Sequence, residues 1–177
     1  VCPRDGFQNI KEAIPTATKI EIIDRLVECG FGVIEATSFV HPKAIPQMAD
    51  AAEVLQSVKK KHGNRAQFVA LAPNLFGAKK AIENGADGIT YVTSASEDHN
   101  LANTKQTVAQ SVAALEEVCK IKGSAKVRLA VATSFDCPFA GKVPTEKVVS
   151  LVEAALNAGT DEIVLADTIG TATPLQV

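Results

Sequence analysis

An arginine and an aspartate stand side by side near the start of the chain, within the segment CPRDGFQN at residues 2–9. Asp5 offers a hard oxygen ligand for a divalent metal, and Arg4 offers a planar fork for a carboxylate or enolate oxygen. Gly6 lets the backbone turn, and the amides of Gln8 and Asn9 can orient a substrate. The alternative is an Asp-Gly turn among solvated polar residues. The motifs further along the chain favour a binding site for an anionic substrate beside a metal.

The composition is that of a soluble globular protein of one domain. The chain has 177 residues, 46% of them apolar and 21% charged, with a net charge of −2. This charge gives no reason to expect a nucleic-acid or membrane surface, and no apolar run is long enough to span a bilayer. The start lacks a signal-peptide pattern and looks trimmed. The four cysteines form no C-x-x-C pair, which favours reduced thiols in a cytosol-like compartment over a zinc ribbon.

Helical and strand patterns alternate along the whole chain, which indicates a parallel sheet. The expected strands cover residues 33–39, 68–73, 89–94, 127–133 and 163–166. The expected helices cover residues 15–30, 50–61, 77–84, 104–122 and 144–157, and a further helix is expected to begin at Pro174. Three of the strands are preceded by a glycine four residues before a strand isoleucine, namely Gly30, Gly85 and Gly159. Such a glycine suits the left-handed cap of the preceding helix.

Hydrophobic periodicity does not distinguish a closed barrel from an open sheet. The polar residues do, because every expected strand ends in side chains that could bind or react. A barrel gathers all strand ends around one mouth, whereas an open sheet uses mainly those at its switch point. No glycine-rich phosphate loop follows any strand. The sequence therefore favours a barrel.

Six blocks of sequence, in this order, resemble the family of 3-hydroxy-3-methylglutaryl-CoA lyase. They are PRDGFQN at 3–9, TSFVHPK at 37–43 with IPQM at 45–48, PNL at 73–75, SASE at 94–97, CPF at 137–139 with GK at 141–142, and DTIG at 167–170. The wider group also includes isopropylmalate and homocitrate synthases. The second and fifth blocks look like the lyase branch.

The resemblance implies a single domain over residues 1–177, a TIM (β/α)8 barrel that is incomplete here. About six strands are expected, counting one that ends just before Cys2, and the seventh and eighth are missing. The chain would then be a fragment, or its remaining strands would come from another chain. The family's other metal ligands, a His-x-His pair and an asparagine on those last strands, have no counterpart in this sequence. We therefore expect that the 177 residues alone cannot hold the full metal site.

The resemblance also implies a reaction, the retro-Claisen cleavage of a 3-hydroxy-3-methylglutaryl thioester to acetyl-CoA and acetoacetate. A divalent metal, Mg or Mn, would chelate substrate oxygens, with Asp5 as one ligand. Arg4 would stabilise the enolate, and Glu35, costly in an apolar strand unless it has a partner, would orient Arg4 or a metal-bound water. The remaining candidates are substrate-orienting groups: Gln8, Ser38, Asn74 and Asp167. A helix cap is equally open for Asp167.

The other reactive residue types have plainer interpretations. His41 is expected in an exposed loop, His62 at a surface helix end and His99 in a solvated loop, although His99 could touch a CoA ester. Cys137 is expected to be a packed loop thiol rather than a nucleophile. The lysines at 59–61 are expected at a solvated helix end, with a basic patch near a CoA phosphate as the alternative.

Two other functions remain open. A Claisen-type acyltransferase would form the bond that the lyase breaks, and a non-catalytic barrel fragment would bind a CoA ester or a partner chain without turnover. In each case an acyl-CoA small molecule is the expected partner, with no nucleic acid and no membrane. A cytoplasmic location is expected, and a homodimer is possible because members of the family are often dimers.

Overall fold

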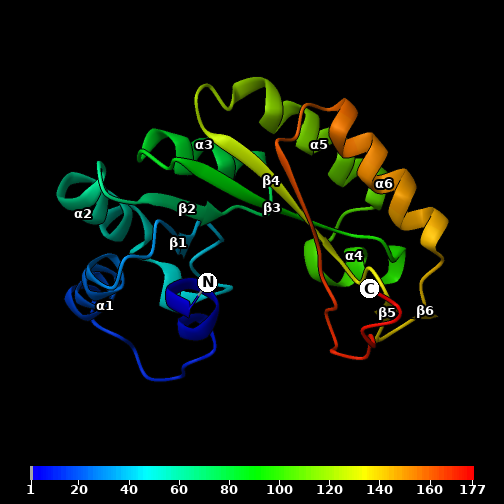
Figure 1. The fold of residues 1–177 in the computed structure, drawn as a ribbon, viewed down its shortest axis with the longest axis horizontal. Helices are drawn as coiled ribbons and strands as arrows, with labels where there is room; N and C mark the ends of the chain where they lie inside the picture. Colours follow the sequence, from blue (N-terminus) through cyan, green and yellow to red (C-terminus); the bar gives the residue numbers. More distant parts are fainter. Residues whose placement is uncertain (1) are drawn as a thin grey trace. The chain divides into compact units, whose positions relative to one another are not determined.

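The structure is a computed structural model that describes residues 2–177 (Figure 1). The chain divides into two compact units, the first ending at Thr90 and the second beginning at Tyr91. In both units strands alternate with helices. Within residues 2–177, no helix combines the length and apolar character needed to cross a bilayer.

The first unit begins with a π-helical turn and then alternates helix and strand. Its elements are η1 (Cys2–Gly6), α1 (Thr16–Glu28), β1 (Val33–Ser38), the 3₁₀ turn η2 (Pro46–Met48), α2 (Ala51–His62), β2 (Gln67–Leu71), α3 (Leu75–Glu83) and the start of β3 (Gly88–Ser94). The strands are buried because helices cover them. Phe68 of β2 and Ile89 of β3 are fully buried.

The second unit continues the same alternation from the end of β3. Its elements are α4 (Glu97–Thr104), α5 (Val108–Ile121), β4 (Lys126–Ala132), the short hairpin of β5 (Asp136–Cys137) and β6 (Gly141–Lys142), α6 (Thr145–Asn157) and β7 (Glu162–Leu165). Helices α5 and α6 pack against each other (Figure 1). Val127, Leu129 and Val131 of β4 are fully buried.

The main sheet has five strands in the order β1-β2-β3-β4-β7. The pairs β1–β2, β2–β3 and β4–β7 are parallel. Since the spatial order follows the chain order, the sheet lacks the reversal of a doubly wound fold and matches part of a (β/α) barrel. All five expected strands are confirmed. The strand before Cys2 that completed the expected count of six lies outside the described residues.

The three expected glycine caps are confirmed. Gly30, Gly85 and Gly159 adopt φ values of 89°, 86° and 93°. At these angles a side chain would be strained, so glycine is the residue that ends each helix and turns the chain into the next strand.

The expected helix over residues 104–122 is confirmed as α5, but it begins at Val108, four residues later than expected. Helix α4 before it was not expected, and it ends where Lys105 adopts a left-handed conformation (φ 62°). A new helix then begins with a capping box, in which the Thr107 side chain accepts from the Gln110 N–H and the Gln110 side chain accepts from the Thr107 N–H. This box is the S/T-x-x-E/Q signature of a helix start.

Both ends of the chain also differ from expectation. Residues 2–8 are helical rather than a loop, with Pro3 and Phe7 buried beneath the turn. Residues 174–176 form a turn and not the start of a helix.

The expectation of a surface position for His62 is also wrong. His62 is 3% exposed, and its Nε2 lies 2.8 Å from Asp24 Oδ1. Lys61 donates to the other oxygen of the same carboxylate at 2.5 Å. Lys59 also has an acidic partner, since it donates to Asp87 at 2.6 Å, while Lys60 and Lys61 are exposed, as expected for a solvated helix end. These polar contacts therefore join the end of α2 to α1 and to the loop before β3.

The stability that these contacts of Asp24 contribute depends on pH. Burial acts to raise the pKa of Asp24, but the hydrogen bonds from Lys61 and His62 outweigh it and hold the pKa below its ordinary value. A carboxyl group with a lowered pKa stabilises the fold above its unfolded-state pKa of about 3.9, and this stabilisation is lost as the pH falls through the folded-state value.

Asp24→Asn should therefore destabilise the protein at pH 7 and reduce the slope of stability against pH in the acid range. Urea unfolding from pH 7 to about pH 3 measures both effects. Glu21→Gln, at an exposed ion pair, is the control, and an unchanged slope in Asp24→Asn would contradict the account.

Gly77 allows α3 to approach the end of β1. A Cβ built at this position would lie 2.4 Å from the backbone oxygen of Phe39. Although alanine is favoured over glycine in helices by about 1 kcal/mol, the clash with backbone should dominate, and we expect Gly77→Ala to lower the unfolding free energy by roughly 1–3 kcal/mol. Chemical denaturation measures the change. Gly32→Ala is the control, because nothing lies within 4 Å of its Cβ; an equal loss in both variants would refute the close-approach explanation.

Candidate active site

Arg4, the expected catalytic cation, lies on the π-helical turn and points to Glu35 of β1. Its Nε donates to Glu35 Oε1 at 2.5 Å. The other oxygen of Glu35 accepts from the Thr90 hydroxyl at 2.7 Å. The Glu35 side chain is 5% exposed and that of Arg4 is 14% exposed. Both carboxylate oxygens of Glu35 are thus engaged, which suits a residue that orients Arg4 rather than one that takes a proton.

Asp5, the expected metal ligand, faces outward from the same turn. Its Oδ1 accepts from Arg4 Nη1 at 2.6 Å and from Gln8 Nε2 at 3.3 Å. Its side chain is 55% exposed. Arg4, Asp5, Gln8 and Glu35 are therefore brought together, as the sequence predicted, into one charged cluster that Thr90 completes.

The cluster fits a divalent metal only in part. The Asp5 carboxylate is an accessible hard oxygen ligand, of the kind that Mg²⁺ takes from one or two protein carboxylates. Within residues 2–177, no group of three or more His, Cys, Asp or Glu side chains could hold a metal ion. Asp5 is thus a single ligand, and any further protein ligands would have to come from elsewhere.

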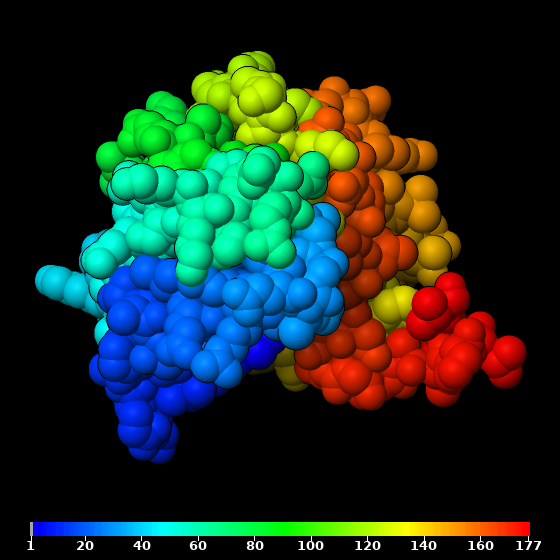
Figure 2. Space-filling view, turned by 60° about the vertical axis from the view of Figure 1, so that its left-hand side comes forward, coloured from blue at the N-terminus to red at the C-terminus, as the bar shows by residue number. Residues whose placement is uncertain are grey.

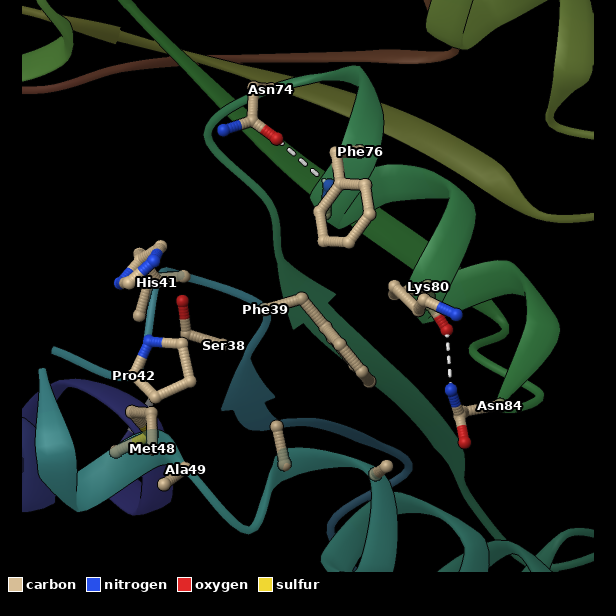
Figure 3. A pocket seen from close by; sticks show the side chains of 14 residues that line it. Ser38, Phe39, His41, Pro42, Met48, Ala49, Asn74, Phe76, Lys80 and Asn84 are labelled. Atoms are coloured by element: carbon tan, nitrogen blue, oxygen red, sulfur yellow. Dashed lines mark hydrogen bonds between the residues drawn. The ribbon is translucent and has the colours of Figure 1, made fainter. Parts of the chain in front are cut away.

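Ser38 and Asn74 do not contact this charged cluster. They line a separate pocket of about 290 Å³ with apolar walls that include Phe39, Met48 and Phe76. Figure 3 shows Ser38 and His41 on one side of the pocket and Phe76 on the other. Asn74 Oδ1 accepts from the Gly77 N–H at 2.8 Å, which makes Asn74 the N-cap of α3.

Asp167 lies in the second unit, in the loop that follows β7. Its two carboxylate oxygens accept from the backbone N–H groups of Thr171 and Ala172, at 3.2 and 2.9 Å. Of the two expected roles, these contacts support a cap, but of a loop turn rather than of a helix.

The remaining candidates in the second unit are His99 and Cys137. His99 Nδ1 lies 2.6 Å from the Ser94 hydroxyl, and burial lowers the pKa of His99. Cys137 is 3% exposed, so the expected packed thiol is confirmed. Burial acts to raise the Cys137 pKa, but hydrogen bonds from the Ser96 hydroxyl and from two backbone N–H groups lower it overall.

The predictions for His41 and for the thiols agree with the structure. His41 is exposed, as expected, and its Nδ1 accepts from the Lys43 N–H at 3.2 Å. All four cysteines are free.

Sequence reasoning missed two residues of the first unit. Thr90 lies within an expected strand and has no predicted role, yet its hydroxyl donates to Glu35. Gln47 lies within a block that resembles the family and has no predicted role, yet its side chain joins distant segments. The signal for Gln47 was an amide within an apolar stretch, which must find partners when it is buried.

A sequence model of the HMGL-like family matches residues 1–177. Among curated proteins, the mitochondrial hydroxymethylglutaryl-CoA lyase of Bos taurus is 40% identical over 98% of this chain and 54% of its own length. Hydroxymethylglutaryl-CoA lyase YngG of Bacillus subtilis is 40% identical over 100% of this chain and 59% of its own length. The chain thus spans between half and two thirds of these relatives.

Solved structures give the same result. An HMG-CoA lyase from Acinetobacter baumannii, in complex with coenzyme A and 3-methylmalate, superposes with a TM-score of 0.93 at 44% identity and covers 99% of this chain and 57% of that one. The enzyme from Brucella melitensis gives a TM-score of 0.92 at 39% identity, over 99% of this chain and 62% of that one. With its five-stranded parallel sheet and a match along its whole length, this chain belongs to the HMGL-like family.

Proposed function

We propose that the protein carrying this chain is a carbon–carbon lyase that cleaves a 3-hydroxy-3-methylglutaryl-CoA-like thioester to acetyl-CoA and acetoacetate. Residues 1–177 would form part of its single catalytic barrel domain. The observation that carries the proposal is the ordered set of Thr90, Glu35 and Arg4, with Asp5 beside it. The relatives named above support the substrate class.

The reaction needs a cation where negative charge develops. A base removes the proton of the tertiary hydroxyl, the bond between the α- and β-carbons breaks, and the alkoxide becomes the ketone of acetoacetate. The electron pair moves into the thioester enolate, which a proton then converts to acetyl-CoA. Arg4, fixed by Glu35, would stabilise that enolate oxygen, because a preorganised donor lowers the barrier where charge appears.

Asp5 would hold a divalent metal, Mg or Mn, and Gln8 would fix the rotamer of Asp5 through its bond to Oδ1. When bound, the metal would act as a Lewis acid on substrate oxygens. The other ligands would be those that the family resemblance implies, a His-x-His pair and an asparagine outside these 177 residues. Substrate contacts by Ser38, Asn74 and Asp167, a homodimer and a cytoplasmic location stay predictions.

Product analysis of the complete gene product tests the proposal. The protein is incubated with 3-hydroxy-3-methylglutaryl-CoA and Mg²⁺, and mass spectrometry should find acetyl-CoA and acetoacetate in equal amounts. A parallel incubation with acetyl-CoA and a 2-oxo acid tests the acyltransferase alternative. Condensation in the second incubation without cleavage in the first would favour the acyltransferase, and binding without turnover in either would favour a non-catalytic role.

A further inference from the structure

The segment that links the charged cluster to the rest of the first unit has little structure of its own. Residues 10–13 are exposed and lie between the N-terminal helical turns and α1, in the blue loop of Figure 1. The same segment forms the blue projection of the first unit in Figure 2. Arg4 and Asp5 stand only a few residues before it. A tether on this segment would therefore help to fix their position.

The side chain of Gln47 supplies such a tether. Its Oε1 accepts from the Ile14 N–H at 3.0 Å, and its Nε2 donates to the backbone oxygens of Ile10 and Glu12 at 3.1 and 2.9 Å. Within residues 2–90, no other hydrogen bond joins the backbone of residues 11–14 to another element. One acceptor and two donors at this spacing match a carboxamide; a carboxylate has no donor and an aliphatic chain has neither.

Gln47 itself is held firmly. It is 9% exposed and belongs to η2, where its backbone oxygen accepts from Lys19 Nζ. Lys19 is 5% exposed and donates to both oxygens of Asp50 at 2.8 and 2.9 Å. Asp50 also accepts from the Thr16 hydroxyl at 2.8 Å. A partly buried ion pair in which both oxygens of the carboxylate are engaged restricts side-chain geometry, so the amide of Gln47 is an anchored group.

A hollow separates part of this segment from the turn that carries Gln47. This hollow of about 480 Å³ lies between residues 8–13 and residues 44–47. Where two segments enclose a hollow, dispersion contacts between them are few. The three bonds of Gln47 are then the main link between the segment and the anchored turn.

We propose that Gln47 is a positioning residue for the reaction proposed above. It fixes the segment after the charged cluster, and through it the placement of Asp5 and Arg4 against the metal and substrate. Glu35 contacts Arg4 of the cluster directly, whereas Gln47 acts on the cluster through the segment that follows it. The proposal rests on the proposed function for its effect on turnover, while the tether itself can be measured without turnover.

Two variants of the complete protein test the proposal. Gln47→Leu removes all three hydrogen bonds, and the freed groups can rehydrate because the segment is exposed. Gln47→Glu keeps the acceptor for the Ile14 N–H but loses both donors. Gln56→Leu is the matched control, because Gln56 makes one exposed hydrogen bond to Asn84 on the surface of the unit. The measurements are amide hydrogen exchange of residues 2–15, Mn²⁺ affinity, and kcat against pH.

In Gln47→Leu, the Ile14 amide should exchange faster by at least about tenfold, and Mn²⁺ affinity and kcat should each fall about 10- to 100-fold, as for loss of a group that orients a ligand. In Gln47→Glu, Ile14 should stay protected while kcat falls. The ratio of its kcat to that of the wild type should rise at lower pH, because a protonated carboxyl regains one donor. Gln56→Leu should match the wild type in all three measurements.

Two results would overturn the proposal: unchanged exchange of Ile14 in Gln47→Leu, or faster exchange with Mn²⁺ affinity and kcat within about twofold of the wild type. Failure of the proposed function looks different, since the wild type itself would then give no cleavage products. In that case exchange and Mn²⁺ affinity alone would decide whether Gln47 positions Asp5.

Discussion

Replacing Arg4 by Gln lowers kcat of the complete protein by about 10²–10³-fold, the usual cost of losing one donor to a developing oxyanion. Glutamine keeps a polar side chain, but it removes the positive charge and the guanidinium group that donates to Glu35. Because the charge on the enolate exists only near the transition state, KM should change much less than kcat. Steady-state kinetics with 3-hydroxy-3-methylglutaryl-CoA measures both constants.

Arg25→Gln is the matched control for this prediction. The Arg25 side chain forms an exposed ion pair with Glu21, at 2.6 Å on α1, so its replacement should leave kcat unchanged. A kcat of Arg4→Gln within threefold of the wild type would remove Arg4 from the reaction and reduce its pair with Glu35 to a structural contact.

Replacing Glu35 by Ala should cost about 3–5 kcal/mol of stability, the range measured when one partner of a buried ion pair is removed. The change removes the buried partner of the Arg4 guanidinium, which is 14% exposed and keeps only the exposed Asp5 as an ion-pair partner within residues 2–177, and it removes the acceptor of the Thr90 hydroxyl. Glu35→Gln should cost less, because the amide oxygen can still accept from Thr90 or Arg4. Both variants should lower kcat, since neither holds Arg4 with a negative charge.

The control for Glu35 is Glu21→Ala, at a carboxylate that is 60% exposed in its ion pair. Exposed pairs contribute about 0–1 kcal/mol, so denaturant unfolding should separate the two sites clearly. Equal losses at Glu35 and Glu21 would show that the buried contacts of Glu35 do not stabilise the fold.

The regular part of the fold was predictable because its signals are local. Hydrophobic periodicity, together with the capping glycines before β1, β3 and β7, predicted the positions of all five strands. The charged cluster was predictable in part, because Arg4 and Asp5 are neighbours and Glu35 is an acid within an apolar strand. Its partner Thr90 was not, since nothing local says that residues 55 positions apart will meet.

The errors have equally specific causes. The expected start of α5 at residue 104 overlooks a local signal, the capping box of Thr107 and Gln110. The end of α4 depends on the left-handed Lys105, a conformation that lysine rarely adopts. His62 was placed at the surface because its neighbours are polar, but its burial depends on a tertiary contact with Asp24. Ser38 ends β1 and Asn74 follows β2, as expected, and both line a pocket separate from the charged cluster, so their contact with substrate stays a prediction.

The most direct test of the account is the binding of Mn²⁺ to the complete protein, measured by electron paramagnetic resonance for the wild type and for Asp5→Asn. Asp98→Asn, at an exposed aspartate of α4, is the control for loss of a carboxylate. If Asp5 is a metal ligand of a catalytic site, Asp5→Asn should weaken Mn²⁺ binding by at least about tenfold and kcat should fall with it, while Asp98→Asn should bind as the wild type does. Equal Mn²⁺ affinity in the wild type and Asp5→Asn would contradict the metal site, and with it the proposed role of the cluster around Arg4.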